Sequence, residues 1–467
     1  MIGSLQMNLK KLMFNNEMSN QKMNKNKQNP NWYLESFVSF EESLNGHSKT
    51  FLHDLRKETL PSLEQLSFPT LKDEEWKYTN ISSISEQNFI PVSKLPQIIL
   101  SKEKLKDFLF QGFDYYLLTF VNGIYSNELS DLERIPEGII IENISTVAKN
   151  NPQILQKYFS KLSKTENIFN AINSVYSVDG SFIKVSDNIV LDKPIQIVHI
   201  NGAEDNKVLS VPRNIIVVGK NSQASIIVNY FGHGSEPYFT NIISEVYVDE
   251  GGIVDLIKNQ SENENSFHIE KLQAFQEKNS VFNHYNFEFG GSIVRNDINS
   301  VLNGENIETH YYGLSLANGK QHIDNHTFVD HAKPNCMSNE VYKAILDDEA
   351  HGVFNGKIIV QKDAQKTNAY QQNKTILLSK KAKIDTKPQL EIFADDVKCS
   401  HGATVGHLDD EAYFYIRTRG IPENLAKSIL IRAFANDVVE SVKIEQIREQ
   451  LNHMIFEHLH RVEIISE

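Results

Sequence analysis

The pattern of apolar and polar positions changes along the chain, and its longest uniform stretch runs from about residue 182 to residue 405. There, short apolar runs rich in Ile, Val, Phe and Tyr alternate with turn signals, and no long helical period intervenes. The turn signals recur roughly every 26 to 30 residues, at 219–221, 249–252, 277–279 and 303–306. Such a repeat predicts stacked β coils, as in a β-helix or β-solenoid. A β-sandwich is the alternative, although its turns usually recur about every 8 to 12 residues.

Helical periods flank this stretch on both sides. Residues 32–66 have a helical pattern in which Pro61 is expected to kink or restart the second helix, and a mixed region follows. After the β stretch, Asp409 is expected to cap a helix that stops at Gly420, and Pro422 to lie in the first turn of the next. We therefore predict four segments: a disordered tail over 1–30, a mixed helical domain over 31–180, a β-helix core over 181–405 and a helical domain over 406–467.

One apolar stripe of the C-terminal helices has no obvious partner. It lies on the helix that follows Pro422 and consists of Leu425, Ile429, Ala433 and Phe434. The stripe either packs on the β stack or docks another protein, and the sequence leaves both possibilities open.

Composition narrows the class of protein. The chain has 467 residues and a formal net charge of −13, which argues against nonspecific nucleic-acid binding. No run of about 18 apolar residues predicts a membrane span, and no export signal is recognisable, so we expect a cytoplasmic protein. The only two cysteines, Cys336 and Cys399, are too few for a disulfide framework, an all-cysteine zinc site or a self-sufficient iron–sulfur cluster.

Motifs of common catalytic sites are absent from the sequence. Between Gly313 and Gly319 lie five residues, and Gln321 follows Lys320 where a phosphate-binding loop would need Ser or Thr. There is also no dinucleotide-binding glycine motif and no nucleophile elbow. We therefore expect a chain that does not hydrolyse ATP by itself.

A histidine series in the β stretch is the first candidate site. It comprises His310, His322, His326 and His331. On a strand, residues 322, 324 and 326 share one face, and neutral imidazole is a common metal ligand. A metal site and a solvated ladder of polar residues explain the pattern equally well.

The second candidate site is the pair Cys399 and His401. On an extended backbone the two side chains point to the same side. A thiolate beside an imidazole is half of a ligand set for iron or an iron–sulfur cluster, and a second chain would have to supply the rest. The alternative is a buried cysteine that acts as a small apolar residue beside a surface histidine.

The residues around this pair resemble a known family. Residues 394–406 (ADDVKCSHGATVG), followed by Asp409, Phe414, Tyr415, Arg417 and 419–421, closely resemble the signature of the SufD family, scaffold subunits of the SUF iron–sulfur cluster assembly machine. Supporting segments lie at 73–79, 120–123, 353–358, 364–369, 377–379 and 387–392. The resemblance covers the chain from about residue 32 onward.

The resemblance implies a right-handed parallel β-helix and a role as a non-catalytic scaffold. It implies edge-to-edge pairing with the paralogous subunit SufB, docking of the ATPase SufC on the C-terminal helices, and a transient iron–sulfur cluster shared with SufB. The family's functional histidine matches His401, and its neighbouring cysteine matches Cys399. A homodimer is also possible. Flavin has been linked to such complexes, but no motif here supports a flavin site.

Three other functions are compatible with parts of the pattern. They are a secreted-type polysaccharide-active β-helix protein, a metal-dependent β enzyme that uses His322 and His326, and a self-assembling structural solenoid without chemistry.

Overall fold

The computed structural model describes residues 31–44, 50–93, 100–202 and 204–465. The predicted tail over residues 1–30 lies outside the described residues. Among those that are described, no helix is both long and apolar enough to cross a membrane.

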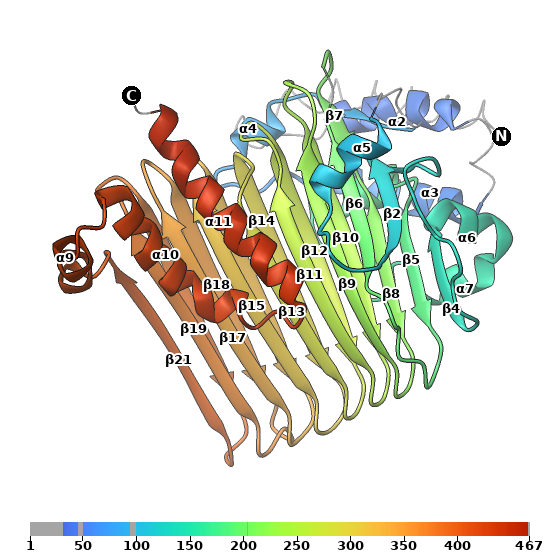
Figure 1. Ribbon diagram of the computed structural model, residues 1–467. Coiled ribbons are helices and arrows are strands. Elements are labelled where there is room, and N and C mark those ends of the chain that lie inside the picture. Colours follow the sequence, from blue (N-terminus) through green and yellow to red (C-terminus); the bar gives the residue numbers. More distant parts are fainter. Residues whose placement is uncertain (1–30, 45–49, 94–99, 203, 466–467) are drawn as a thin grey trace.

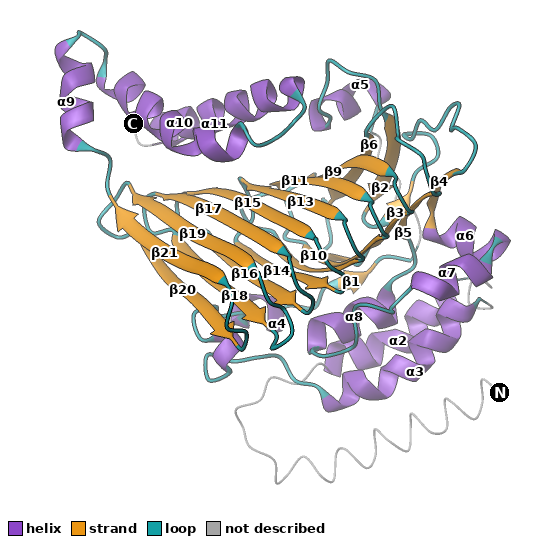
Figure 2. Ribbon diagram, turned by 90° about the horizontal axis from the view of Figure 1, so that it is seen from below, coloured by secondary structure: helices purple, strands orange, loops and turns teal. Residues whose placement is uncertain are grey.

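Two long sheets form the body of the molecule (Figures 1 and 2). The first sheet contains, from one edge, β20 (Lys383–Ile392), β18 (His351–Val360), β16 (His322–His331), β14 (Ile293–Leu302), β12 (Phe267–Gln276), β10 (Phe239–Val248), β8 (Arg213–Val218), β5 (Gly180–Val185) and β4 (Ile139–Asn143), with β7 (Val208–Ser210) and β1 (Ile90–Pro91) attached beside β10. The second contains β21 (Lys398–Gly406), β19 (Asn368–Leu377), β17 (Met337–Leu346), β15 (Glu308–Ala317), β13 (Val281–Glu288), β11 (Ile253–Ser261), β9 (Gln223–Gly232), β6 (Ile195–Asn201), β2 (Tyr116–Val121) and β3 (Ile124–Tyr125).

From β8 onward the chain alternates between the two sheets, so each strand pairs in parallel with the strand two places along, whereas β2 with β3 and β4 with β5 pair antiparallel. Phe267 pairs with Ile293, 26 residues later, and His351 pairs with Lys383, 32 residues later. These sequence separations are the lengths of single coils, and their range includes the spacing of the turn signals in the sequence. The structure therefore confirms the mainly β fold with a β-helix core, and the parallel pairing rules out a β-sandwich.

Alternate residues of each strand point into the space between the sheets. Apolar side chains from both sheets meet there, among them Val246 and Leu272 of the first sheet and Leu256 and Phe282 of the second. Each new coil buries the apolar edge of the previous one, which is how a solenoid obtains a continuous core.

Helices cover the outer faces of both sheets (Figure 2). The first sheet carries α2 (Asn31–Ser43), α3 (Phe51–Gln65) and α8 (Ile168–Tyr176), which share an apolar cluster with residues such as Phe239 and Phe267. Shorter helices of the N-terminal region are α4 (Ser82–Ser85), α6 (Ile144–Asn150) and α7 (Pro152–Tyr158), with the 3-10 turn η2 (Glu74–Trp76). The short helix α5 (Lys102–Leu105) and the 3-10 turn η3 (Lys106–Phe108) instead pack on β2 and β6 of the second sheet.

The second sheet is covered by the C-terminal helices α10 (Glu423–Val439) and α11 (Glu445–Ile465). They lie across β11 to β17, while α9 (Asp410–Thr418) stands beyond β21 at the end of the solenoid (Figure 1). Helical regions at both ends of the chain are thus confirmed, whereas the predicted domain boundaries stay predictions.

Individual helix signals agree with the structure in part. The Asp409 carboxylate accepts hydrogen bonds from the backbone N–H groups of Glu411 and Ala412, and Gly420 follows α9 with a φ of +83°. Pro422 is the cap residue of α10, one place earlier than expected. Pro61 neither ends nor restarts a helix, because α3 runs through it.

Candidate functional site

The Cys399–His401 pair lies on β21, the last strand of the solenoid. In register, Cys399 pairs with Ala369 and His401 with Gln371 of β19. Cys399 packs against the inner apolar core, so this set of alternate positions faces the space between the sheets. His401, two residues further along, shares that inner face, as the sequence pattern predicted.

Because β21 belongs to the final coil, its inner face is not covered by a further coil. His401 is exposed and Cys399 is half-buried. Both β20 and β21 terminate their sheets, and neither has a strand partner on its outer edge within the described part of the chain (Figure 2). Exposed apolar side chains lie on this last coil, among them Phe393 at 60% and Val405 at 47% exposure. An unpaired edge of this kind is a template for pairing with another strand.

The two thiols have different surroundings. Burial raises the pKa of the Cys399 thiol, so it is largely protonated at neutral pH and would need a bound metal to become a thiolate. Cys336 is buried in the core, where its Sγ donates to the Gly304 carbonyl at 3.2 Å. Among the described residues no group of three or more His, Cys, Asp and Glu side chains is arranged to hold a metal ion. Cys399 and His401 are therefore at most a partial ligand set.

A buried polar ladder, which the sequence analysis did not single out, lies behind His401. Gln371 of β19 pairs with His401 of β21, and Glu340 of β17 pairs with Gln371. Both side chains are fully buried. Burial raises the pKa of the Glu340 carboxyl to about 7, although hydrogen bonds from Thr327 and Gln371 act in the opposite direction. Polar residues at alternate strand positions were the available signal, but the sequence alone does not say which face is internal.

The histidine series does not form one site. His331 points inward to Ser338, and His310 lies beside Glu308 on the outer face of the second sheet. His322 and His326 share the outer face of β16 with Asp324, as predicted. The Asp324 carboxylate is already occupied, since it accepts from Arg295 Nη1 at 2.8 Å and contacts His326 Nε2 at 3.0 Å.

The partners of this outer face come from the N-terminal segment 73–79. Thr79 Oγ1 lies 2.5 Å from Asp324 Oδ2 and 2.8 Å from His322 Nε2. Arg295 stacks on the Trp76 ring at 3.9 Å and donates to the Glu75 carbonyl. The neighbouring cations outweigh the effect of burial and hold the pKa of Asp324 well below its usual range. These contacts give His322 and Asp324 a structural role, which fastens the segment to the first sheet.

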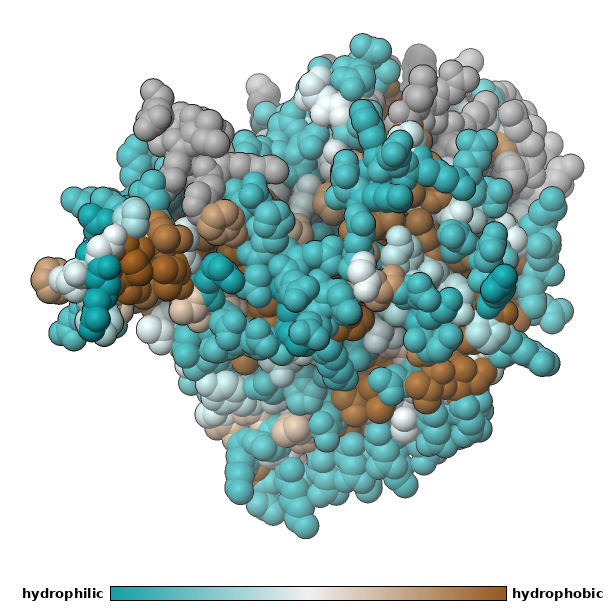
Figure 3. Space-filling view, in the orientation of Figure 1, coloured by the Kyte–Doolittle hydropathy of each residue, from teal (hydrophilic) through white to brown (hydrophobic). Residues whose placement is uncertain are grey.

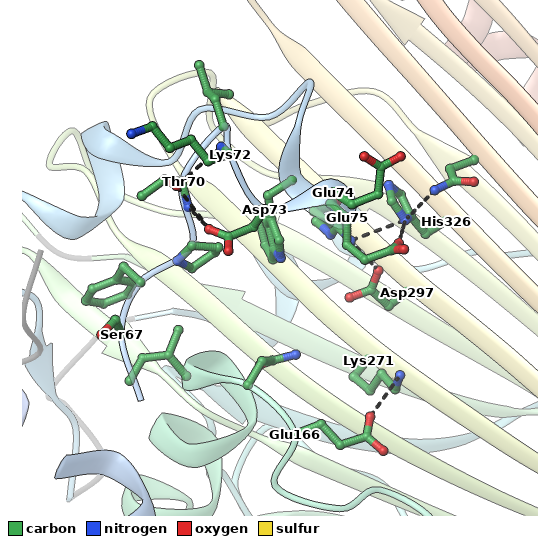
Figure 4. Close-up of a pocket in the computed structure, with 18 of the residues that line it drawn as sticks. Ser67, Thr70, Lys72, Asp73, Glu74, Glu75, Glu166, Lys271, Asp297 and His326 are labelled. Atoms are coloured by element: carbon green, nitrogen blue, oxygen red, sulfur yellow. Dashed lines mark hydrogen bonds and ion pairs between the residues drawn. The ribbon is translucent and has the colours of Figure 1, made fainter. Parts of the chain in front are cut away.

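A large groove runs beside these contacts, between segment 65–82 and the first sheet (Figure 4). Its volume is about 1640 Å³, and its charged side chains are mostly paired with one another. Lys271 pairs with Glu166, Lys387 with Glu74, and His326 with Glu75. The groove lies on the outer face of the first sheet, whereas Cys399 and His401 face inward from the second, so it is separate from their chemistry.

The predicted apolar stripe of α10 divides in the structure. Leu425 and Ile429 are 43% and 38% exposed, Ala433 is exposed, and Phe434 packs partly against the second sheet. The buried face of α10 consists of other residues: Ala426, Ser428, Ile431, Ala435, Val438 and Val439. Figure 3 shows apolar side chains gathered near α9 and α10, and Phe414 of α9 is 70% exposed. We refer to Leu425, Ile429 and Ala433 as the α10 stripe.

Comparisons with known proteins agree with this architecture. A family model described as the SufBD core domain of SUF system FeS cluster assembly matches residues 199–434, and one described as the SufBD protein N-terminal region matches residues 24–197. An iron–sulfur cluster assembly SufBD family protein of Synechocystis is 29% identical over 88% of this chain and 92% of its own length.

Two relatives carry the name iron–sulfur cluster assembly protein SufD. That of Escherichia coli is 31% identical over 84% of this chain and 89% of its own length, and that of Bacillus subtilis is 26% identical over 91% and 96%. Matches of this extent, together with the β-helix core, show that the chain belongs to the SufBD family of iron–sulfur cluster assembly proteins.

Proposed function

We propose that this chain is a SufD-type scaffold subunit that completes a cluster-assembly site together with SufB. The observation that supports this most strongly is the position of the Cys399–His401 pair, an incomplete ligand set on the exposed inner face of the last coil. The free edges of β20 and β21 would pair with the SufB solenoid, and SufB would supply the remaining ligands. His401 would bind iron or handle a proton, and Cys399 would assist it.

The C-terminal helices are proposed to dock SufC. The α10 stripe and the exposed aromatic side chains of α9 offer an apolar surface of the kind that protein partners cover. ATP binding and hydrolysis would belong to SufC, and the scaffold itself would be non-catalytic. Movement of the SufC subunits would then open the interface between the two solenoids and admit iron and sulfide to His401. Both cysteines are free thiols, as a reducing cytoplasmic location would require.

The test is to co-express the chain with its SufB and SufC and to compare His401→Ala with Ser400→Ala. Ser400 is the neighbour of His401 on the opposite face of β21. We expect both variant complexes to assemble, measured by size-exclusion chromatography. Iron and acid-labile sulfide should be lost only from the His401→Ala complex. Normal cluster content in that complex would refute the role of His401.

A further inference from the structure

Three inner-facing residues lie in one row across the last three strands of the second sheet. Glu340 of β17 pairs with Gln371 of β19, and Gln371 pairs with His401 of β21. Adjacent strands lie about 4.8 Å apart, so side chains in one row stack on their neighbours. Gln371 is therefore the nearest side chain behind His401 on the same sheet.

The orientation of the Gln371 amide follows from its other neighbour. Thr327 Oγ1 and Gln371 Nε2 both donate to Glu340 Oε2, at 2.6 Å and 3.0 Å. Because Glu340 Oε2 accepts both hydrogen bonds, whether or not Oε1 carries a proton, Gln371 presents its NH₂ group to Glu340. Its carbonyl Oε1 then points away from that contact, and this buried atom has no partner among the described residues.

The opposite sheet holds the amide in place. A Cβ atom at Gly356 of β18 would lie 2.3 Å from Gln371 Nε2 and 2.7 Å from its Cδ. Gly356 does not have a positive φ, so the position needs glycine for space and not for backbone conformation. This accounts physically for the glycine in segment 353–358.

We propose that Gln371 positions His401 for metal binding by accepting a hydrogen bond from one of its ring nitrogens at Oε1. Neutral imidazole carries one N–H, so this bond fixes the tautomer and leaves the lone pair of the other nitrogen free at the open end of the solenoid. Metal-binding histidines usually have such a partner on their second nitrogen, and its loss typically lowers metal affinity or activity by about 10- to 100-fold. Gln371 is thus a positioning residue, and Glu340 holds its amide. The inference rests on the proposed role of His401.

The test uses the full chain with ¹⁵N-labelled histidine, and His401→Ala assigns the signals. In the wild-type protein we expect one tautomer of His401 to dominate. In Gln371→Met, which keeps the side-chain length but removes the acceptor, we expect the two-tautomer mixture of a free imidazole. Gln372→Met is the matched control, because Gln372 neighbours Gln371 on the opposite face of β19, and it should leave the tautomer unchanged.

A second readout uses the complex with SufB and SufC. The apparent affinity of the complex for Fe²⁺ should fall about 10- to 100-fold in Gln371→Met and remain unchanged in Gln372→Met. Gly356→Ala, which displaces the amide without removing it, should also mix the tautomers. A tautomer mixture in the wild-type protein, or an unchanged single tautomer in Gln371→Met, would overturn the inference. Normal cluster formation in His401→Ala would instead refute the proposed function, whatever the tautomer of His401.

Discussion

The Thr79 hydroxyl donates to Asp324 Oδ2 at 2.5 Å, and this bond joins residues that are 245 positions apart in the sequence. A hydroxyl has one hydrogen to donate, and here an acceptor-only carboxylate takes it. His322 Nε2 lies 2.8 Å from Thr79 Oγ1 and must therefore carry a hydrogen and donate it to this hydroxyl oxygen. The N-terminal segment is thus fastened to β16 by a specific tautomer of a neutral histidine.

Replacement of Thr79 by Val should destabilise the protein without changing the volume of the site. The buried Asp324 carboxylate loses a hydrogen bond, and an unsatisfied buried group costs about 1–3 kcal/mol. We expect a decrease of this size in the free energy of urea unfolding. Thr165→Val, at an exposed threonine, is the matched control and should change this quantity by less than about 0.5 kcal/mol. Equal stabilities of the two variants would show that the hydrogen bond between Thr79 and Asp324 does not stabilise the fold.

The contact of His322 with Thr79 should also make the stability of the protein depend on pH. Burial lowers the pKa of His322 to about 4, although the Asp324 charge partly opposes this. A histidine with a depressed pKa contributes stability that is present above its unfolded-state value of about 6.5 and is lost as the pH falls towards 4. Between pH 7 and pH 5 this loss amounts to about 2 kcal/mol.

Unfolding by urea at both pH values should therefore show a smaller pH dependence in His322→Gln than in the wild-type protein. His453→Gln replaces an exposed histidine and serves as control, with the wild-type pH dependence retained. An unchanged slope in His322→Gln would show that another group carries the effect.

The architecture could be predicted from the sequence because a solenoid repeats. Each coil of β10 to β21 carries its own turn signal and apolar run, so the period is visible without any knowledge of long-range contacts. The shared face of Cys399 and His401 was predictable for a similar reason, because it depends only on the two-residue period of a strand.

Other features depend on contacts that no local pattern reveals. His322 and Asp324 look like metal ligands until their partner Thr79 is known, and that residue comes from a distant segment. The ladder of Glu340 and Gln371 depends on which face of each strand is internal. A polar residue at an alternate position is compatible with either face, so the pattern leaves the ladder undetermined.

Glu340 should destabilise the protein as the pH rises. Its pKa is raised from 4.5 to about 7 by burial, so the folded protein holds this proton more tightly than the unfolded chain. The resulting cost begins above about pH 4.5 and is fully present above pH 7. Between pH 5 and pH 8 it amounts to about 2 to 3 kcal/mol.

Glu340→Gln removes the titrating group and keeps an acceptor for Thr327. We expect its unfolding free energy, relative to that of the wild-type protein, to increase by about 2 to 3 kcal/mol from pH 5 to pH 8. Glu264→Gln, at an exposed position, should show no such change. If the difference between Glu340→Gln and the wild-type protein were independent of pH, the carboxyl would not titrate in this range.

The α10 stripe should matter for partner binding and not for folding. Leu425 and Ile429 are exposed, and the helix is held on the second sheet by its other face and by Lys343, whose Nζ lies 2.6 Å from Asp437 Oδ2. The double variant Leu425→Glu/Ile429→Glu should therefore unfold within about 0.5 kcal/mol of the wild-type protein. If SufC covers the stripe, two buried charges should weaken its retention on the affinity-purified scaffold at least tenfold, which corresponds to about 1.4 kcal/mol.

Leu71→Glu provides the control, because Leu71 is 51% exposed on the N-terminal segment over the other sheet. Undiminished SufC in the double variant, at normal stability, would exclude the stripe as the docking surface and favour the exposed aromatic residues of α9.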